Sequence, residues 1–239
     1  MRTGVLLAAS LAALTLGACQ KAAAGPDDDA FGRKVRAYLL AHPEVIQEAV
    51  QALQTRQAAE DAAAEAKAKA DLPKLRAALE RDPRDFVANP GGKITVVEFF
   101  DYRCPHCANI APKVVDLIRH NPNVRFVFKE MPIFGPTSRH AAVAAMAVKS
   151  AGGDYVGLYD ALMRTHPLDD GAIDRIALRM GAKTADLAPS TADKSQLDAT
   201  TALFSKLNLG GTPAFIVGDE IIYGEDIEGL NAAVAKAGA

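Results

Sequence analysis

A buried strand is predicted over residues 94–100, an apolar run interrupted only by Thr95 and Glu98. Such nearly continuous runs are typical of strands in parallel sheets, which are covered on both faces. Apolar residues with helical spacing follow through residues 110–117, and a second apolar run occupies residues 124–128. The order strand, helix, strand implies a right-handed parallel crossover, so we expect a parallel sheet to begin here.

The remaining pattern completes an α/β domain. Helical spacing continues from about 138–207, and a short apolar run at 214–217 indicates a return to extended structure. A turn at Gly218 separates this run from a second short strand at 221–223, and a last helix is expected at about 226–237. The predicted order is therefore strand, helix, strand, several helices, two strands and a helix.

The segment before this domain has a helical pattern but few bulky apolar residues. Residues 31–39 and 46–53 carry apolar side chains at helical spacing, and a run without Gly or Pro continues to Asp71. Pro73 is expected to open a third short helix that ends near Asp82. About sixty residues with so little apolar surface do not fold as an independent globule. The helices therefore pack either on the following domain or on copies from other chains, as an oligomerisation stalk.

The start of the chain has the pattern of an export signal. A basic residue precedes an apolar run over residues 5–16 that lacks the polar face of an amphipathic helix. Residues 16–19, Leu-Gly-Ala-Cys, resemble the lipobox of bacterial lipoproteins, in which the cysteine receives a diacylglycerol. The alternative is ordinary cleavage after residues 22–24, which would discard Cys19. We expect a signal peptide over residues 1–24, or one that ends before Cys19 if the lipobox is used. In both cases we expect the mature protein to be periplasmic, where disulfides persist.

Composition describes an ordinary globular protein and excludes several classes. The 239 residues include 27 basic and 29 acidic side chains. The formal net charge of −2 lacks the excess of positive charge that is typical of nucleic-acid-binding proteins. Three cysteines do not form a framework of structural disulfides. After the signal segment, no apolar run approaches the ~20 residues that a membrane-spanning helix requires. We therefore expect neither nucleic-acid binding nor a membrane span in the mature protein.

Two of the cysteines form the motif Cys104-Pro105-His106-Cys107, after the first predicted strand and before the first helix of the sheet domain. A Cys-x-x-Cys motif can serve redox chemistry or metal binding. Zinc sites normally need a second pair of ligands, but the chain has no second such motif and its other histidines are scattered singly. A copper site that uses both thiolates is conceivable, because copper accepts soft ligands. We expect a redox pair, with no metal and no other cofactor.

The position of the motif predicts which sulfur is reactive. Cys104 precedes the helix, so its sulfur faces unpaired N–H groups and the positive end of the helix dipole, which favour the thiolate. Pro105 starts the helix without adding an unsatisfied donor, and His106 adds a proton donor or a positive charge beside the sulfur. Cys104 is therefore the expected nucleophile, and Cys107, one turn into the helix, is the expected resolving thiol.

Glu98 is the one charged residue in the first predicted strand. Burial there should raise the pKa of its carboxyl group, so that it could relay a proton to or from Cys107 as the disulfide opens. The alternative is a structural ion pair, for which Lys129 at the end of the second strand is a plausible partner. The two roles are compatible.

The Cys-Pro-His-Cys motif at 104–107 and the sequence Gly-Thr-Pro-Ala-Phe at 211–215 together resemble the DsbA family of extracytoplasmic thiol-disulfide oxidoreductases. The resemblance covers residues 91–239 and implies an α/β thioredoxin fold with a helical insertion at about 136–207. The helical N-terminal extension at 25–90 contains the sequence His-Pro-Glu-Val-Ile. It resembles the N-terminal segment of ScsC-type proteins (suppressor of copper sensitivity), relatives of DsbA that can be oligomeric isomerases.

In the resembled fold, Thr212 and Pro213 pack directly against the Cys-x-x-Cys motif, and the bond between them is cis. Because Pro213 lacks an N–H group, the edge of the sheet stays clear, and Thr212 can hydrogen-bond an extended substrate segment. A threonine at this position resembles disulfide isomerases more than the strongest oxidases.

The resemblance implies an exported enzyme that exchanges thiols and disulfides in cysteine-containing proteins. We expect an isomerase or reductase of wrongly paired disulfides, kept reduced by a membrane protein similar to DsbD or ScsB and held as a homo-oligomer through residues 30–89. The first alternative is a monomeric oxidase similar to DsbA, reoxidised by a membrane protein similar to DsbB. The second alternative, from another class, is a copper-binding protein that uses the same thiols.

Overall fold

The structure is a computed structural model that describes residues 26–239, which fall into two compact units. The first unit ends at Ala58, and the second runs from Ala59 to Ala239. The predicted export signal and Cys19 lie outside the described residues. Among the described helices, none combines the length and the apolar character that crossing a bilayer requires.

The first unit contains α1 (Pro26–Ala41) and the beginning of α2 (Glu44–Glu80). The two predicted helices are therefore confirmed, and the chain leaves helical structure between them at His42 and Pro43. Large apolar side chains of this unit are exposed: Phe31, Val35, Tyr38, Leu40, Ile46, Val50 and Leu53. Within residues 30–58 no side chain is buried, which agrees with the prediction that this segment lacks a core of its own.

The prediction that Pro73 opens a third helix is wrong, because α2 continues through Pro73 to its end. A proline inside a helix removes one backbone hydrogen bond and costs ~3 kcal/mol. Packing offsets this cost, since Ala68, Leu72 and Leu79 are buried in the core of the second unit. The second half of α2 is therefore part of the sheet domain, whereas the sequence pattern placed the start of that domain near residue 91.

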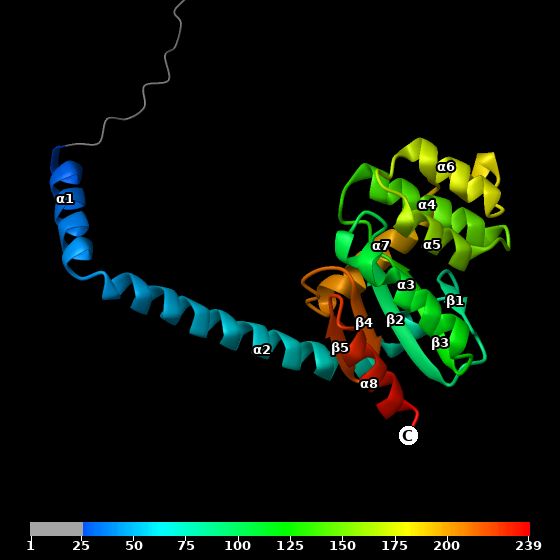
Figure 1. Cartoon of the computed structure of the whole chain (residues 1–239), viewed down its shortest axis with the longest axis horizontal. Coiled ribbons are helices and arrows are strands. Elements are labelled where there is room, and N and C mark those ends of the chain that lie inside the picture. The colour runs from blue at the N-terminus through cyan, green and yellow to red at the C-terminus, as the bar shows by residue number, and fades with distance from the viewer. Residues whose placement is uncertain (1–25) are drawn as a thin grey trace, which may run out of the picture. The chain divides into compact units, whose positions relative to one another are not determined.

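Five strands of the second unit form one sheet, in the order β1-β3-β2-β4-β5 (Figure 1). The strands are β1 (Phe86–Ala88), β2 (Ile94–Phe100), β3 (Val124–Glu130), β4 (Ala214–Val217) and β5 (Glu220–Tyr223). The pair β2–β3 is parallel, which confirms the predicted crossover, and the other neighbouring pairs are antiparallel. No pattern predicted β1, because its three residues are too few to show an alternation.

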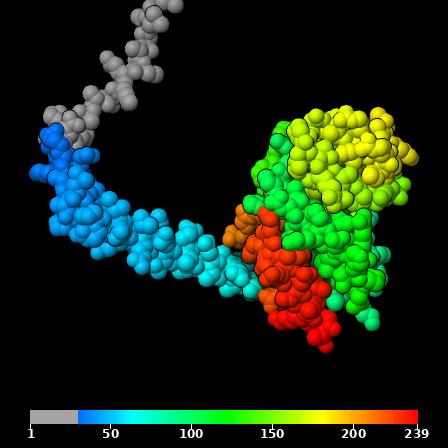
Figure 2. Space-filling model, in the orientation of Figure 1, coloured from blue at the N-terminus to red at the C-terminus, as the bar shows by residue number. Residues whose placement is uncertain are grey.

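Helices cover both faces of the sheet. Besides the end of α2, the helices of the second unit are α3 (Pro105–His120), α4 (Pro136–Ser150), α5 (Tyr155–Arg164), α6 (Asp170–Arg179), the short 3-10 helix η1 (Thr184–Leu187), α7 (Thr191–Lys206) and α8 (Ile227–Ala237). The segment from α4 to α7 is the predicted helical insertion. Figure 2 shows a large part of it, in yellow, as a rounded lobe of the second unit.

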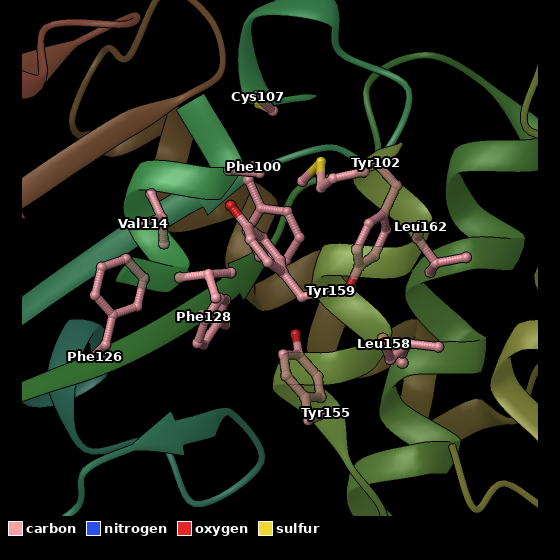
Figure 3. Close-up of a cluster of buried hydrophobic side chains, with 14 of the residues drawn as sticks. Phe100, Tyr102, Cys107, Val114, Phe126, Phe128, Tyr155, Leu158, Tyr159 and Leu162 are labelled. Atoms are coloured by element: carbon pink, nitrogen blue, oxygen red, sulfur yellow. The ribbon is translucent and has the colours of Figure 1, made fainter. Parts of the chain in front are cut away.

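Alternate residues of the strands point to opposite faces, so the sheet separates two cores. In the core of Figure 3, Phe100, Phe126 and Phe128 pack against Val114 of α3 and Leu158 of α5. The other core joins strands to α2 and α7 and includes Val97, Phe99, Val127, Ile216, Leu72 and Leu203. We call the first face, which also contains the two cysteines of the motif, the cysteine face, and the second the α2 face.

Candidate active site

The Cys-Pro-His-Cys motif lies at the junction of β2 and α3, as predicted. Cys104 is the N-cap residue of α3, with an extended backbone (φ −74°, ψ 119°), and Pro105 occupies the first turn. A residue before proline avoids the helical region and proline fits a first helical turn, so the local sequence places Cys104 at the helix start. The Asp101 carboxylate holds the preceding loop, because it accepts hydrogen bonds from the backbone N–H groups of Arg103 (2.7 Å) and Phe134 (3.0 Å).

Cys104 lies just beneath the surface, where its thiol donates a hydrogen bond to the backbone carbonyl of Thr212 (Sγ–O 3.2 Å). Its pKa is lowered from 9.0 to about 5. The main cause is a hydrogen bond with the Cys107 thiol; the Thr212 side chain and the backbone N–H groups of Cys107 and His106 act in the same direction, while burial opposes them. The acidity of Cys104 thus has the predicted direction, but the neighbouring thiol contributes more than the start of the helix.

His106 is exposed and lies next to Glu225, with 2.6 Å between Nδ1 and Oε1. This hydrogen bond is the main reason that the pKa of His106 is raised above 6.5. The same carboxylate oxygen accepts a hydrogen bond from Asn109 (3.1 Å). Sequence reasoning missed Glu225, because it is 119 residues from His106 and no motif connects them. The charge of a protonated His106 is therefore shared with a carboxylate rather than directed at Cys104 alone.

Cys107 is fully buried on the cysteine face (Figure 3). Burial raises the pKa of its thiol well above the ordinary value, and the hydrogen bond to Cys104 and the negative charge of Glu98 act in the same direction. Both cysteines are free thiols in this structure. At neutral pH Cys104 is therefore a thiolate and Cys107 keeps its proton. Among residues 26–239, no group of three or more His, Cys, Asp or Glu side chains is arranged to hold a metal ion.

Glu98 is fully buried in β2, and its two carboxyl oxygens accept the hydroxyl of Tyr159 at 3.1 and 3.3 Å. Burial raises the pKa of Glu98 from 4.5 to about 8, and the Tyr159 hydrogen bond offsets only part of this effect. An acid that titrates near neutral pH can both take and give a proton. The pattern predicted the raised pKa but not Tyr159, whose helix α5 shows no sequence sign of facing β2.

The predicted alternative of an ion pair between Glu98 and Lys129 is wrong. The β2–β3 register aligns Glu98 with Phe128, the residue before Lys129, so the two charged side chains point to opposite faces. On the α2 face, Lys129 pairs with Asp85 (Nζ–Oδ2 2.5 Å) and donates to the Ala78 carbonyl of α2 (2.7 Å). Lys129 therefore anchors α2 and does not contact the cysteine pair.

A second buried carboxyl group, Glu130, lies at the end of β3. It accepts hydrogen bonds from the hydroxyls of Tyr102 (3.1 Å) and Tyr155 (2.5 Å), and burial raises its pKa. Tyr102 is two residues from Cys104, so this group ties the loop before the motif to α5. In the sequence, Glu130 is visible only as a charged residue at the end of an apolar run. Such a pattern does not identify the two tyrosines that it binds.

Thr212 and Pro213 lie directly against the motif, and the peptide bond between them is cis, as the resemblance implied. Thr212 is 8% exposed, and its side chain contributes to the lowered pKa of Cys104. The Pro213 carbonyl accepts the N–H of Gly224 (2.9 Å), which holds the loop against the end of β5. Tertiary structure thus brings Thr212 to Cys104, 108 residues away in the chain.

Two known families match this chain. Residues 95–235 match the family described as the DSBA-like thioredoxin domain. Residues 27–60 match the family described as the copper resistance protein ScsC N-terminal domain. The first match contains the cysteine pair and the Thr212–Pro213 loop, and the second contains α1 and the beginning of α2.

Solved structures of related proteins have the same fold. A thioredoxin-like oxidoreductase from Silicibacter pomeroyi is 37% identical, with a TM-score of 0.61 over 68% of this chain and 96% of that chain. Proteus mirabilis ScsC in a transitional conformation is 27% identical, with a TM-score of 0.65 over 88% of this chain and 96% of that chain.

Curated relatives match part of this chain. The thiol:disulfide interchange protein DsbA of Bordetella parapertussis is 29% identical over 58% of this chain and 72% of its own length. The Na(+)/H(+) antiporter NhaA 1 of Salinispora arenicola is 33% identical over 65% of this chain, which spans 25% of the length of that antiporter. Because the DSBA-like match covers more than half of the residues, the chain belongs to the DsbA-like thioredoxin family and carries an ScsC-type segment before its sheet domain.

Proposed function

We propose that this chain is a thiol-disulfide oxidoreductase that acts on cysteine-containing proteins, with Cys104 as the nucleophile. The observation that carries the proposal is the contrast between the two thiols. The pKa of Cys104 is lowered to about 5, whereas that of Cys107 is raised. The thiolate is the reactive form of cysteine, so Cys104 is ready to attack and Cys107 is not.

In the reductive direction, the Cys104 thiolate attacks one sulfur of a client disulfide. A bond forms between Cys104 and that sulfur, the client disulfide breaks, and the second client sulfur leaves as a thiolate that takes a proton from water. Cys107 then loses its proton and attacks Cys104, which forms the Cys104–Cys107 disulfide and releases the first client sulfur. The client gains two electrons and the chain loses two, and the reverse sequence oxidises a client dithiol.

Glu98 supports the second step, in which Cys107 must lose a proton from a buried position. Its carboxylate form can take this proton, and its pKa of about 8 means that both forms exist near neutral pH. The electrostatic effect of Glu98 on the pKa of Cys107 indicates that the two groups are close enough to influence each other. Tyr159 holds the carboxyl group in place.

An isomerase or reductase is the favoured role. The first unit exposes a set of large apolar side chains within a segment that matches the ScsC N-terminal domain. Copies of this segment packed together would bury these side chains and place several active sites around one misfolded client. A membrane reductase would keep the Cys104–Cys107 pair reduced, and the threonine at position 212 agrees with this role.

Removing residues 26–58 tests this role, because the second compact unit begins at Ala59. We expect the full chain to be an oligomer that reactivates a protein with scrambled disulfides, and the truncated chain to be a monomer with much lower isomerase activity. A full chain that is already monomeric would remove the argument for an isomerase. A deletion of residues 30–89 is unsuitable, since it would remove Leu72 and Leu79 from the core.

The rival role is a monomeric dithiol oxidase. A stabilised Cys104 thiolate favours the reduced form of the pair, which makes the disulfide form a stronger oxidant. Faster oxidation of a reduced client than reactivation of a scrambled one would support this rival. The same measurement on the truncated chain separates the two roles, because an oxidase does not need the first unit.

Copper binding through the two thiols is a candidate of another class, favoured by the name of the family that residues 27–60 match. Reactivation of a scrambled protein in the presence of a strong copper chelator separates it from catalysis. Undiminished turnover would show that exchange does not depend on copper.

We infer an extracytoplasmic place of action, which the pattern of the first residues and a relative support. A periplasmic thioredoxin-like protein from Salmonella enterica serovar Typhimurium is 27% identical, with a TM-score of 0.63. An extracytoplasmic location fits the export signal of the sequence and the need for stable disulfides. Mass spectrometry of the mature N-terminus decides whether Cys19 carries a lipid.

A further inference from the structure

A groove lies on the helical insertion, next to the loop that joins β3 to α4. It has a volume of about 330 Å³ and is lined by Gly135, Pro136, Arg139, His140, Val143 and Pro189. All of these residues belong to the second compact unit, and none of them is an aspartate or a glutamate. We call this feature the insertion groove.

Arg103 connects the insertion groove with the reactive thiol. It directly precedes Cys104, and its side chain donates a hydrogen bond to the backbone carbonyl of Phe134 (Nη1–O 2.8 Å). Gly135, the next residue along the chain, is the first residue that lines the groove. The guanidinium group of Arg103 is therefore fixed where the loop of the cysteine pair meets the groove.

Arg103 and Arg139 both carry a positive charge that no carboxylate neutralises. Both residues are exposed, and neither forms an ion pair with any of residues 26–239. The Phe134 carbonyl that accepts the Arg103 guanidinium is a neutral group. Asp101 is close to Arg103 in the chain, but it is 2% exposed and its carboxylate accepts two backbone N–H groups instead. The two arginines can therefore accept an acidic partner from outside the chain.

Other charged groups around the groove are paired with each other. His140 lies next to Asp174, with 2.7 Å between Nε2 and Oδ1. In the neighbouring hollow beside Arg139, Asp198 pairs with Lys194 (2.7 Å). α4 begins at the groove without a side-chain cap and without an acidic residue in its first turn, so the positive end of its dipole adds to the charge of Arg139. An acidic side chain that enters the groove would therefore meet an excess of positive charge.

We propose that Arg103 and Arg139 bind acidic side chains of the client, close to the cysteine that Cys104 attacks. The chain would then act preferentially on clients whose reactive cysteine has aspartate or glutamate residues nearby. This inference rests on the proposed thiol-disulfide exchange and names the class of client for that same site.

An extended client chain has the reach that this arrangement requires. Each residue of a strand adds ~3.3 Å and alternate side chains share a face, so residues two and four positions from the cysteine lie about 7 and 13 Å along on the same side. Arg103 is the immediate neighbour of Cys104, and Arg139 lies one helical turn, ~5.4 Å, beyond the start of the groove at Gly135. The methylene groups of a bound glutamate could pack on the apolar lining of the groove while its charge meets an arginine.

The test uses two peptides, each with one cysteine joined in a disulfide to thionitrobenzoate. One peptide carries glutamate two and four residues from the cysteine on either side, and the other carries glutamine at these positions. The Cys104 thiolate attacks the peptide sulfur, and the coloured thionitrobenzoate thiolate leaves, because it is the better leaving group. We expect the ratio of the two rate constants, glutamate over glutamine, to fall about 2- to 10-fold in the Arg103→Gln, Arg139→Gln double variant.

Comparing ratios removes any change in the reactivity of Cys104 itself, because such a change affects both peptides equally. As a matched control, Arg119→Gln with Arg179→Gln removes two exposed arginines in the last turns of α3 and α6, which do not line the groove. This control removes the same charge from the chain and should keep the wild-type ratio. The difference in ratio between wild type and the Arg103, Arg139 variant should also shrink as salt rises, because salt screens exposed charges.

The outcomes distinguish the two claims. If the Arg103, Arg139 variant keeps the wild-type ratio, or if its difference from wild type does not change with salt, recognition by the two arginines is refuted while exchange by Cys104 stands. If the control pair lowers the ratio as much, overall charge and not this site sets the preference, which also refutes the inference. If wild type reacts with neither peptide, the proposed thiol-disulfide exchange itself fails.

Discussion

The two faces of the sheet bury polar groups in different ways. On the cysteine face, the fully buried Glu98 accepts hydrogen bonds from the neutral Tyr159, and its pKa rises to about 8. On the α2 face, Lys129 and Asp85 are just as buried, but they form an ion pair that also involves Gln196. Burial raises the pKa of both carboxyl groups, but the Lys129 ammonium offsets part of this effect at Asp85, whose pKa rises only to about 6.

The two faces of the sheet therefore have different roles: the α2 face anchors a helix, and the cysteine face holds the reactive groups. The α2 face secures the end of α2, because Lys129 and Arg125 of β3 donate hydrogen bonds to the α2 carbonyls of Ala78 and Glu80, both at 2.7 Å. The cysteine face holds the two thiols and the buried carboxyl group of Glu98. One sheet can thus carry both functions, because neighbouring residues of a strand point to opposite sides.

The largest expected effect comes from the cysteine pair. Cys104→Ser should abolish thiol-disulfide exchange, because the nucleophile is lost, whereas Cys107→Ser should accumulate mixed disulfides with clients, because the resolving thiol is lost. Gel analysis of acid-trapped complexes under non-reducing conditions measures both. Equal trapping by the two variants would reverse the roles assigned to the cysteines.

On the α2 face, Asp85→Asn should destabilise the protein by about 3–5 kcal/mol, because Lys129 would stay buried without its carboxylate. Urea denaturation measures this loss. The double variant Asp85→Asn, Lys129→Met removes both charges and should recover part of the stability. The rate at which Cys104 is alkylated should be the same in wild type and in both variants. A clear change of this rate in either variant would show that the two faces are not independent.

On the cysteine face, Glu98→Gln should slow the release of the mixed disulfide by about 100-fold, because the amide cannot take the Cys107 proton. Rapid mixing with a disulfide-linked peptide measures this step separately from the first attack. The matched control is Glu130→Gln, which changes the other buried carboxyl group at the end of the neighbouring strand. Equal slowing by both variants would indicate a general packing effect and not a proton transfer.

The Glu98→Gln variant should also change how the stability of the protein depends on pH. The raised pKa means that the folded chain holds the Glu98 proton more tightly than the unfolded chain, so this contribution to stability is complete below about pH 4.5 and is lost as the pH rises through about 8. Wild type should therefore lose about 4 kcal/mol more than Glu98→Gln between pH 5 and pH 9. Parallel stability curves for the two proteins would contradict the raised pKa.

The smallest effect is expected at the exposed edge of the site. Glu225→Gln should lower the pKa of His106 toward 6.5, which NMR titration measures, because the hydrogen bond to the carboxylate is its main cause. The alkylation of Cys104 should keep its midpoint near pH 5, since the Cys107 thiol is the main cause of that acidity. Cys107→Ala should instead move the midpoint upward. If Glu225→Gln shifted the alkylation midpoint of Cys104 more than Cys107→Ala did, His106 and not Cys107 would be the main cause of the acidity of Cys104.

Sequence patterns predicted most of the sheet and the reactive pair. The apolar runs of β2 and β3 and the hairpin of β4 and β5 are strong signals, since buried strands need continuous apolar residues. The motif at 104–107 identified both thiols. The pattern did not reveal that Pro73 lies within α2, because a proline in a helix is tolerated only where packing offsets its cost, and the packing partners of α2 lie on distant strands.

The sequence by itself determined the local features: the position of Cys104 at a helix start, the burial of Glu98 in a strand, and the absence of a core within residues 30–58. Only tertiary structure decided which groups meet. Tyr159 reaches Glu98, Glu225 reaches His106, and Lys129 turns to Asp85, through contacts between segments far apart in the chain. Local conformation depends on neighbouring residues and is readable along the chain, whereas these contacts depend on how helices and strands pack, which no short stretch of sequence encodes.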